Sequence, residues 1–444
     1  MSAFQHQVLI YCEQISHRLQ YVLEWIFQEQ LQMDFRVTYD VAHWKAYDGL
    51  KINYSEKRIG VEDILVRPHR LIYEVGETVQ QLNINRWKKS TVLFYNQPGA
   101  LIPFDIFSAV FYLISRYEEY LPHKKDGHGR YLHSNSAAFQ YAFIQQPVVD
   151  EWINALRSIL EKKFKLLLPQ QSFEFQPTYD IDIAWAYKNK PRKQNIGGAL
   201  RDLLRLRIGW FFDRILVASS GRQDPYDAFK WMEDLQQYYG LQPVYFFLVG
   251  ANGTYDRNIS PAHPEMQALI RHTSTHAQVG LHPSYGSYLQ QSVMEKELHT
   301  LESILDKPVW KSRQHYIKMS LPDTYRQLES MGIQNDYSMG YPAVNGFRAG
   351  TSRSFMWYDL SNETKSELRV HPFCFMETTA INHYNNSKTE AYAELERLVF
   401  TLKQSRGKLI SIFHNNNLGS GREHKGWYKF YQKMIELIHS EQNL

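Results

Sequence analysis

From residue 173 onward, short apolar runs alternate with longer stretches in which apolar residues recur at helical spacing. This alternation predicts parallel strands joined by helices, because a crossover helix returns the chain to the same end of the sheet. Strands are expected at residues 173–183, 243–249, 278–282, 309–316, 334–337, 368–375 and 409–414. Seven such units favour an α/β fold of the distorted (β/α)7 barrel type.

Polar side chains occupy the ends of these predicted strands, where the chemistry of such barrels collects. Asp180 and Asp182 lie two residues apart, so their side chains point to the same face of the strand. Two carboxylates held this close repel each other, and folded proteins usually accommodate them around a cation or a proton. The other strand-end residues are His282, Arg313, His315, Asp336 and His414. The pattern predicts one functional site at this edge.

Residues 1–168 are expected to form a smaller α/β accessory domain ahead of the barrel, which spans residues 173–444. This first segment holds several strand-like runs and helical stretches but no catalytic constellation. Its polar loop with His128 and Arg130 is interpreted as a solvent-exposed turn. The sequence does not state what the accessory domain does.

Composition excludes several functional classes. A net charge of +4 over 444 residues makes no case for nucleic-acid binding, and no window is apolar enough to span a membrane. Two distant cysteines predict no disulfide framework, and the start lacks the features of a signal peptide, so a cytoplasmic location is expected. The 30 tyrosines and 10 tryptophans fit carbohydrate contact as well as ordinary packing.

An insertion at about residues 190–222 interrupts the barrel pattern. Its segment 198–217 combines a wide apolar helical face with several arginines. One interpretation is a peripheral helix on a membrane surface, which would give access to a lipid-linked sugar. The other is a lid helix that packs its apolar face on the barrel and leaves its arginines in solvent. The arginines are Arg201, Arg205, Arg207 and Arg214.

The ordered motifs within residues 173–440 resemble the polysaccharide deacetylase family (NodB-homology domain, carbohydrate esterase family four). Thr178-Tyr-Asp-Ile-Asp182 is similar to the family's first motif, T-F-D-D, with one extra residue between the aspartates. The resemblance implies that Asp180 is the catalytic base and Asp182 a metal ligand. Gly280-Leu-His-Pro-Ser-Tyr285 is similar to the second motif, H-x-x-x-H, which implies that His282 is a second ligand.

Two further motifs imply catalytic roles. Ser312-Arg-Gln-His-Tyr316 is similar to the family's third motif, R-x-P-Y. By that match, Arg313 orients the base and the backbone N–H of Tyr316 contributes to an oxyanion hole. Leu409-Ile-Ser-Ile-Phe-His414 is similar to the fifth motif, with His414 as the general acid.

The sequence departs from the family pattern at the third metal ligand, because Gly286 occupies the position of the second histidine in H-x-x-x-H. Catalytic zinc usually has about three protein ligands, so another group is needed. His315 is our candidate, since it lies two residues from Arg313 on one strand and faces the same side. Ser287 or a water molecule is the alternative. The expected cofactor is a divalent metal, most simply zinc.

These residues predict a metal-dependent hydrolase that removes an N-acetyl group from a carbohydrate, either a polysaccharide or a lipid-linked sugar. Arg348, in a glycine-flanked loop, is expected either to bind an anion or sugar hydroxyl or to pair with a nearby carboxylate. The alternative functions are a non-catalytic glycan-binding protein with an eroded metal site and a metal-independent amidohydrolase. The presence of Asp180, Arg313 and His414 together argues against a pure binder, which needs no separate base and acid.

Overall fold

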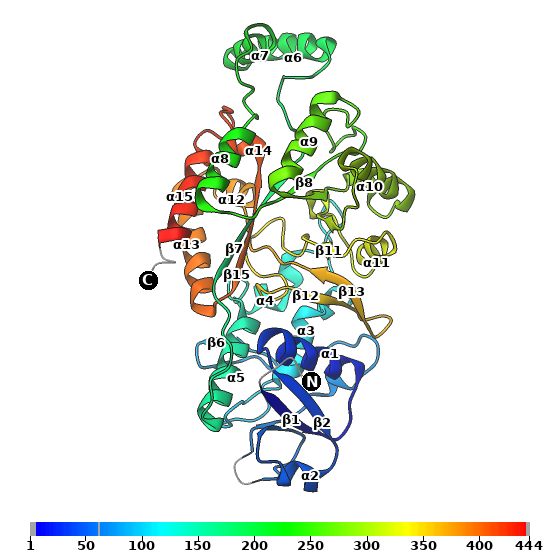
Figure 1. Ribbon diagram of the computed structural model, residues 1–444, viewed down its shortest axis with the longest axis vertical. Coiled ribbons are helices and arrows are strands. Elements are labelled where there is room, and N and C mark those ends of the chain that lie inside the picture. Colours follow the sequence, from blue (N-terminus) through cyan, green and yellow to red (C-terminus); the bar gives the residue numbers. More distant parts are fainter. Residues whose placement is uncertain (1–5, 61–62, 441–444) are drawn as a thin grey trace.

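The computed structural model describes residues 6–60 and 63–440. Its N-terminal part contains a parallel sheet of four strands in the order β2-β1-β3-β4, shown in blue in Figure 1. The strands of this part are β1 (Gln7–Cys12), β2 (Asp34–Thr38), β3 (Leu50–Tyr54) and β4 (Leu65–Val66), with a separate hairpin of β5 (Asn85–Trp87) and β6 (Ser90–Val92). The helices are α1 (His17–Leu23), α2 (Val41–Ala46), α3 (Ile106–Ile114), α4 (Ala137–Gln140) and α5 (Val148–Phe164).

The C-terminal part is built on a larger sheet of nine strands in the order β12-β13-β11-β10-β9-β8-β7-β15-β14. Every pairing in it is parallel except that of β12 with β13. The strands are β7 (Glu174–Ile181), β8 (Val244–Phe247), β9 (Gln278–Leu281), β10 (Lys311–Ser312), β11 (Asn335–Asp336), β12 (Phe355–Asp359), β13 (Thr364–Val370), β14 (Phe375–Met376) and β15 (Lys408–His414).

Helices connect these strands as the alternating pattern predicts. They are α6 (Arg192–Leu204), α7 (Ile208–Ser220), α8 (Phe229–Tyr239), α9 (Pro264–His276), α10 (Gln291–Leu305), α11 (Asp323–Ser330), α12 (Glu377–His383), α13 (Lys388–Ser405), α14 (Asn415–Leu418) and α15 (Trp427–Ser440). The mixed α/β class with parallel strands is therefore confirmed. Among the described residues the hydrogen-bonded order leaves β12 and β14 as edges, so a closed barrel stays a prediction.

Strand register brings distant polar residues together at the carboxyl end of the large sheet. Strands β7 and β15 are buried on both faces, as parallel strands covered by helices are, and they pair so that Asp180 lies opposite His414. On its other side β7 pairs with β8, and β9 follows with Leu281 directly before His282. Neighbouring parallel strands therefore present their terminal side chains to one common space.

The N-terminal part packs against the antiparallel edge of the large sheet. Tyr21 donates a hydrogen bond to the carbonyl of Met356, and Trp25 donates one to the carbonyl of Ser354. Arg18 forms an ion pair with Glu363 beyond the end of β12. One hydrophobic core runs through both parts. Strand β12 is thus covered, which removes the pairing hazard of an open sheet edge.

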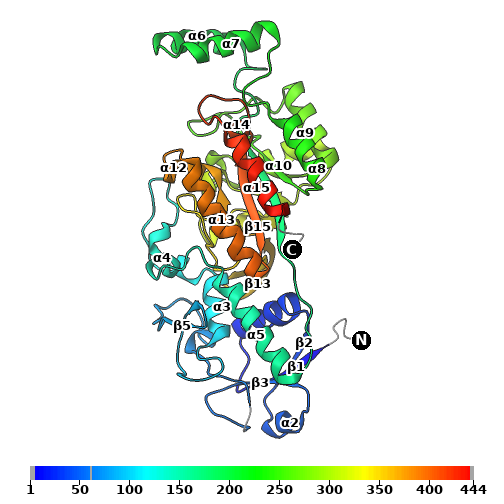
Figure 2. The same ribbon diagram turned by 90° about the vertical axis from the view of Figure 1, so that its left-hand side faces the viewer.

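The inserted helices α6 and α7 contact each other and lie at one end of the long axis of the molecule, away from the large sheet (Figures 1 and 2). Most of their large apolar side chains are exposed, so the expectation of a lid packing its apolar face on the sheet is wrong. Within the described residues, no helix is both long and apolar enough to cross a membrane.

Candidate active site

A cleft of about 600 Å³ opens where the strands of the large sheet end. It collects side chains from separate strand ends and from the loops that follow them. Asp180 and Asp182 come from the end of β7, His282 follows β9, and His414 ends β15. His315 and Tyr316 lie in a short 3₁₀ turn after β10. The sequence-predicted group thus converges in one place.

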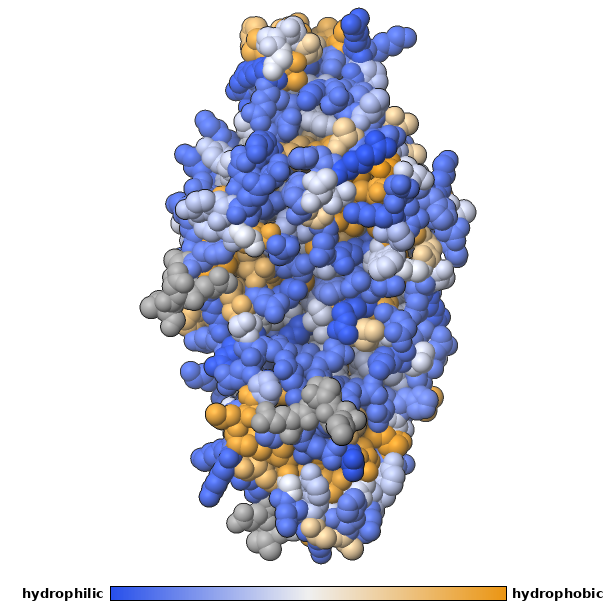
Figure 3. Space-filling model, viewed as in Figure 1, coloured by the Kyte–Doolittle hydropathy of each residue, from blue (hydrophilic) through white to orange (hydrophobic). Residues whose placement is uncertain are grey.

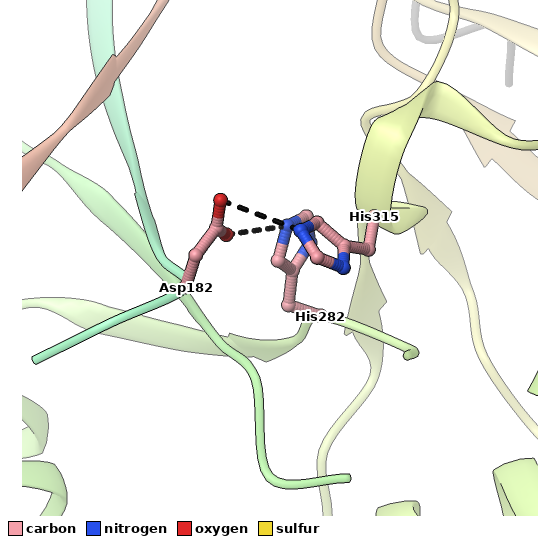
Figure 4. Close-up of side chains that lie close together, drawn as sticks. All are labelled: Asp182, His282 and His315. Carbon is pink, nitrogen blue, oxygen red and sulfur yellow. Dashed lines mark ion pairs between the residues drawn. The ribbon is translucent and has the colours of Figure 1, made fainter. Parts of the chain in front are cut away.

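Asp182 is the centre of this group. Its carboxylate lies 3.1 Å from Nε2 of His282 and 3.4 Å from Nε2 of His315 (Figure 4). Nε2 of His414 approaches it to 3.6 Å from another side. Three imidazoles therefore present the same ring nitrogen to one carboxylate.

The opposite ring nitrogen of each histidine is bonded to an acceptor. Nδ1 of His282 faces the carbonyl of Arg313, Nδ1 of His315 lies 2.8 Å from Asp256, and Nδ1 of His414 lies 2.7 Å from Glu377. Carbonyls and carboxylates can only accept, so each Nδ1 carries the hydrogen. A neutral ring then directs the lone pair of Nε2 toward Asp182, as metal-binding histidines with a carboxylate or carbonyl behind them do.

This donor set fits a divalent metal. Ligand atoms of Asp182, His282 and His315 all lie within 4.8 Å of one another. Oδ1 of Asp182 is buried and, in the described part of the chain, accepts no well-aligned hydrogen bond, although Nε2 of His282 lies 3.1 Å away, an arrangement that suits two ligand atoms of one cation. Two imidazole nitrogens and one carboxylate oxygen suit zinc, with a position left open for water. Ser287 donates its hydroxyl hydrogen to the carbonyl of Ser284 and does not line the cleft.

Neighbouring charges shift the pKa values of the residues in this group. Burial raises the pKa of Asp182, but the neighbouring His315 and His414 outweigh it and hold that pKa well below its usual range. Burial lowers the pKa of His315, yet Asp182 and Asp256 raise it to about 9. Burial also lowers the pKa of His414, but Glu377 and Asp182 outweigh burial and raise that pKa to about 10. A metal would therefore compete with protons for this site.

Asp180 is held by a buried arginine. Nη1 of Arg313 donates to Oδ1 of Asp180 at 2.8 Å, and Nε of Arg313 donates to the carbonyl of Tyr337 at 3.0 Å. The guanidinium also lies 4.5 Å from the centre of the Phe246 ring. Arg313 is fully buried, so its orientation is fixed on several sides. The free oxygen of Asp180 lies 3.8 Å from His282 and faces the cleft.

His414 is held by a carboxylate to which the sequence analysis gave no role. Oε1 of Glu377, the first residue of α12, accepts from the ring and the backbone N–H of His414 and from the side chain of Asn417. Glu377 is fully buried. Asp256, which orients His315, was missed as well, because it lies in a loop and follows no predicted strand.

The N-terminal part supplies one wall of the cleft, so the expectation that its loop is merely a solvent-exposed turn is wrong. Arg130 donates to the backbone carbonyl of Tyr316, and the His128 ring packs 5.3 Å from the Tyr316 ring. Tyr255 and Tyr285 lie beside them, with ring centres 4.2 Å apart. This aromatic wall joins residues more than 180 positions apart in the chain.

Two other predicted residues lie outside the cleft. Arg348 is buried and pairs with both oxygens of Glu119. Of its two expected roles, the binding of substrate is therefore wrong, and the arginine pairs with a carboxylate instead. Asp336 is buried and hydrogen-bonded to Ser338, and burial raises its pKa to about 6. Neither residue lines the cleft.

Tyr316 has a left-handed backbone, with a φ of 59°. This conformation is costly for a residue with a bulky side chain and is often found at functional sites. Its side chain is partly exposed and lines the cleft. The backbone turn thus sits beside Asp182 and His315, where an oxyanion-binding N–H is expected.

A second group of potential ligands lies between α8 and α9. Glu233, His272 and His276 bring their ligand atoms within 4.8 Å of one another. His272 is more than half exposed, and the group adjoins none of the cleft residues named above. It serves as an internal comparison for any measurement of bound metal.

A family model matches part of the chain, and several solved structures are similar to about three fifths of it. A family of unknown function (DUF7033) matches residues 8–165. No curated protein matches the chain. A solved structure of a putative polysaccharide deacetylase from Mycobacterium smegmatis matches 61% of this chain and 85% of its own, with 10% identity and a TM-score of 0.38.

Other solved structures give similar values. The polysaccharide deacetylase Bc1974 from Bacillus cereus matches 62% of this chain and 89% of its own, at 8% identity and a TM-score of 0.29. The allantoinase PuuE matches 61% and 85%, at 11% identity and a TM-score of 0.40. Polysaccharide deacetylases are thus among the structures that this chain is similar to, and the case for its function rests on the cleft residues themselves.

Proposed function

We propose that the protein is a metal-dependent hydrolase that removes an N-acetyl group from a carbohydrate. The observation that carries this proposal is the set of groups gathered in one cleft. A three-residue ligand set lies beside a carboxylate fixed by Arg313 and an imidazole fixed by Glu377. Amide hydrolysis needs a base for water, an electrophile for the carbonyl and an acid for the leaving amine.

Asp182, His282 and His315 are the proposed ligands of the metal. A bound divalent ion would polarise the amide carbonyl and lower the pKa of water toward ~7. The chain itself sets the orientation of these ligands, because Asp256 and the Arg313 carbonyl fix the two imidazole rings. Nε2 of His315 lies 3.4 Å from Asp182, whereas Ser287 does not line the cleft. This position supports His315 over Ser287 as the third ligand.

The remaining cleft residues are assigned to proton transfer. Asp180 accepts the proton of the attacking water, and Arg313 aligns the carboxylate through a charged hydrogen bond. His414 donates a proton to the departing nitrogen, and Glu377 stabilises the imidazolium form that makes this possible. The backbone N–H of Tyr316 is the proposed donor to the developing oxyanion, a contribution of several kcal/mol in comparable sites.

The aromatic wall supports a carbohydrate as substrate. Tyr255 and Tyr316 line the cleft and offer flat apolar faces beside polar groups, a combination that fits the mixed C–H and hydroxyl surface of a sugar ring. Tyr285 packs against Tyr255, and Nζ of Lys318 lies over the Tyr285 ring, 3.6 Å from its centre.

Acetate release from N-acetylated oligosaccharides by zinc-loaded protein tests the proposal. Asp180→Asn should lower the rate by about 10²–10⁴-fold, the usual contribution of a general base, with metal content unchanged. Because the variant leaves the buried guanidinium of Arg313 without its counter-charge, its melting temperature should fall, and the two rates are compared at a temperature at which both proteins are folded. Asp234→Asn is the matched control, since Asp234 is an exposed carboxylate on α8. Full activity of Asp180→Asn would overturn the assignment of the base. Binding of the oligosaccharides without acetate release by the wild type would favour the glycan-binding alternative.

A further inference from the structure

The α6–α7 hairpin (residues 192–220) carries an apolar stripe on each helix. In both helices the apolar residues recur at positions i, i+4, i+7 and i+8, the spacing of one helical face. They are Ile196, Leu200, Leu203 and Leu204 in α6, and Ile208, Phe212, Ile215 and Leu216 in α7. A stripe of this kind normally faces a protein core. Here all eight side chains are exposed, by 37% to 75%.

Charged residues occupy the inner side of the hairpin instead. Arg214 of α7 donates two hydrogen bonds to Asp202 of α6, and both side chains are buried. The guanidinium of Arg214 also lies 4.5 Å from the centre of the Tyr187 ring. Asp213 pairs with Arg422, which belongs to the loop after α14. The hairpin is therefore held to itself and to the body by ion pairs, with its apolar stripes turned outward.

The exposed part of the hairpin is also strongly basic. Both acidic residues, Asp202 and Asp213, are buried and paired. The exposed basic residues are Arg192, Lys193, Arg201, Arg205 and Arg207. In Figure 3, orange apolar and deep blue polar side chains adjoin each other at this end of the molecule. Apolar stripes flanked by arginines are typical of helices that lie in the interface of a membrane.

We propose that the α6–α7 hairpin docks the protein on an anionic phospholipid surface. Each helix has 13 residues, a length of about 20 Å, which is too short to cross a hydrocarbon core. The hairpin therefore lies on the surface, with its leucines and Phe212 among the acyl chains and its arginines at the lipid phosphates. Charge complementarity selects an anionic lipid over a neutral one.

The hairpin is connected to the cleft. The chain passes from Asp182 and Ile183 in the cleft to the start of α6 within ten residues. Asn416 lines the cleft, and it also lines a small hollow with Trp210 and Asp213 of α7. If the proposed hydrolase activity holds, docking would bring the cleft to a sugar carried on a lipid. The docking itself does not depend on that activity.

Vesicle flotation of the full chain tests the docking. Wild type should float with phosphatidylcholine vesicles that contain phosphatidylglycerol and at least about tenfold less with pure phosphatidylcholine, since each basic residue near an anionic surface contributes ~1 kcal/mol. Leu206, in the turn between α6 and α7, is a further apolar residue of the hairpin and is 83% exposed. The triple variant Leu204→Ser, Leu206→Ser, Phe212→Ser should lose flotation on both. Arg201→Glu, Arg205→Glu, Arg207→Glu should lose it on the anionic vesicles.

Two controls keep the result interpretable. Val75→Ser with Leu167→Ser removes equally exposed apolar side chains from the N-terminal part and should float like wild type. Circular dichroism melting should show that every variant is folded. Failure of the wild type to float on anionic vesicles would overturn the proposal. So would a wild-type dimer that the apolar triple variant converts to a monomer, because a second copy would then cover the stripes.

Discussion

The cleft and the α6–α7 hairpin both depart from the usual rule that apolar side chains are buried and charged ones are exposed. The cleft buries charged side chains, whereas the hairpin exposes apolar ones. In the cleft, carboxylates and imidazoles are gathered into a largely buried space around Asp182. In the hairpin, leucines and isoleucines face solvent while the ion pair of Asp202 with Arg214 is buried. Both arrangements cost folding free energy. Each marks a place where we propose a partner from outside the chain, a cation in the cleft and a lipid surface at the hairpin.

The largest expected effect is the loss of the metal site. Asp182→Ala removes the carboxylate that all three histidines face, so bound metal and acetate release should both be lost, the latter by at least about 10³-fold. Elemental analysis of the purified protein checks the metal. His272→Ala, which disrupts the group between α8 and α9, should keep the metal of the cleft. Retention of metal by Asp182→Ala alone would place the ion elsewhere.

Next in size is the effect of breaking the ion pair inside the hairpin. Asp202→Asn leaves the buried guanidinium of Arg214 without its counter-charge, which costs about 3 kcal/mol or more in comparable buried pairs. The loss should be local, with faster amide hydrogen exchange in residues 192–220 and unchanged exchange in β7 and β15. Uniform loss of protection over the whole chain would show that the hairpin is part of the main folding unit.

A smaller effect is expected at the carboxylate behind His414. Glu377→Gln keeps the size of the side chain but removes the charge that favours the imidazolium form, so kcat should fall by about 10–100-fold, as for other orienting partners. KM should change little, because Glu377 is buried away from the substrate. A change confined to KM, with kcat intact, would contradict the role given to His414.

The smallest effect is expected from the apolar stripes. The triple variant Leu204→Ser, Leu206→Ser, Phe212→Ser should change the free energy of unfolding by less than about 1.5 kcal/mol, about 0.5 kcal/mol for each substitution, because the side chains are already largely in water. Activity on a soluble oligosaccharide should also be unchanged. Chemical denaturation and acetate release measure the two. A large loss of stability would mean that the stripes are packed in solution.

The sequence predicted most of the β/α order, because helical and strand periodicities are local properties. Each expected strand has a counterpart, although residues 368–375 fall across β13 and β14, and β12 was not expected. Strand β12 forms an antiparallel hairpin with β13, and its five residues lack a regular alternation of buried and exposed positions. Neither the pairing nor the covering N-terminal part is encoded in the local pattern.

The site was predictable where it follows strand ends and not where it depends on loops. Asp180, His282 and His414 follow the rule for parallel strands. Glu377 and Arg130 come from a helix start and a distant turn, and only the folded chain brings them to the cleft. Arg348 shows the converse limit, since no local feature distinguishes a substrate-binding arginine from one buried against a carboxylate.

The ion pair of Arg348 with Glu119 affects how the molecule unfolds. Its partner Glu119 belongs to the N-terminal part and also binds Arg116. Burial alone would raise the pKa of Glu119, but the two arginines lower it to about 2. The stabilisation from this ionised carboxylate is therefore present above about pH 4.5, the usual pKa of the group, and is lost as the pH falls toward 2.

Because this charge network joins the two parts, unfolding of the N-terminal part would remove the partner of Arg348, and unfolding of the C-terminal part would leave Glu119 with Arg116 alone. Thermal unfolding should be one cooperative transition, and the C-terminal part expressed alone should be insoluble. The N-terminal part then acts as a folding partner of the sheet that it covers, in addition to forming one wall of the cleft.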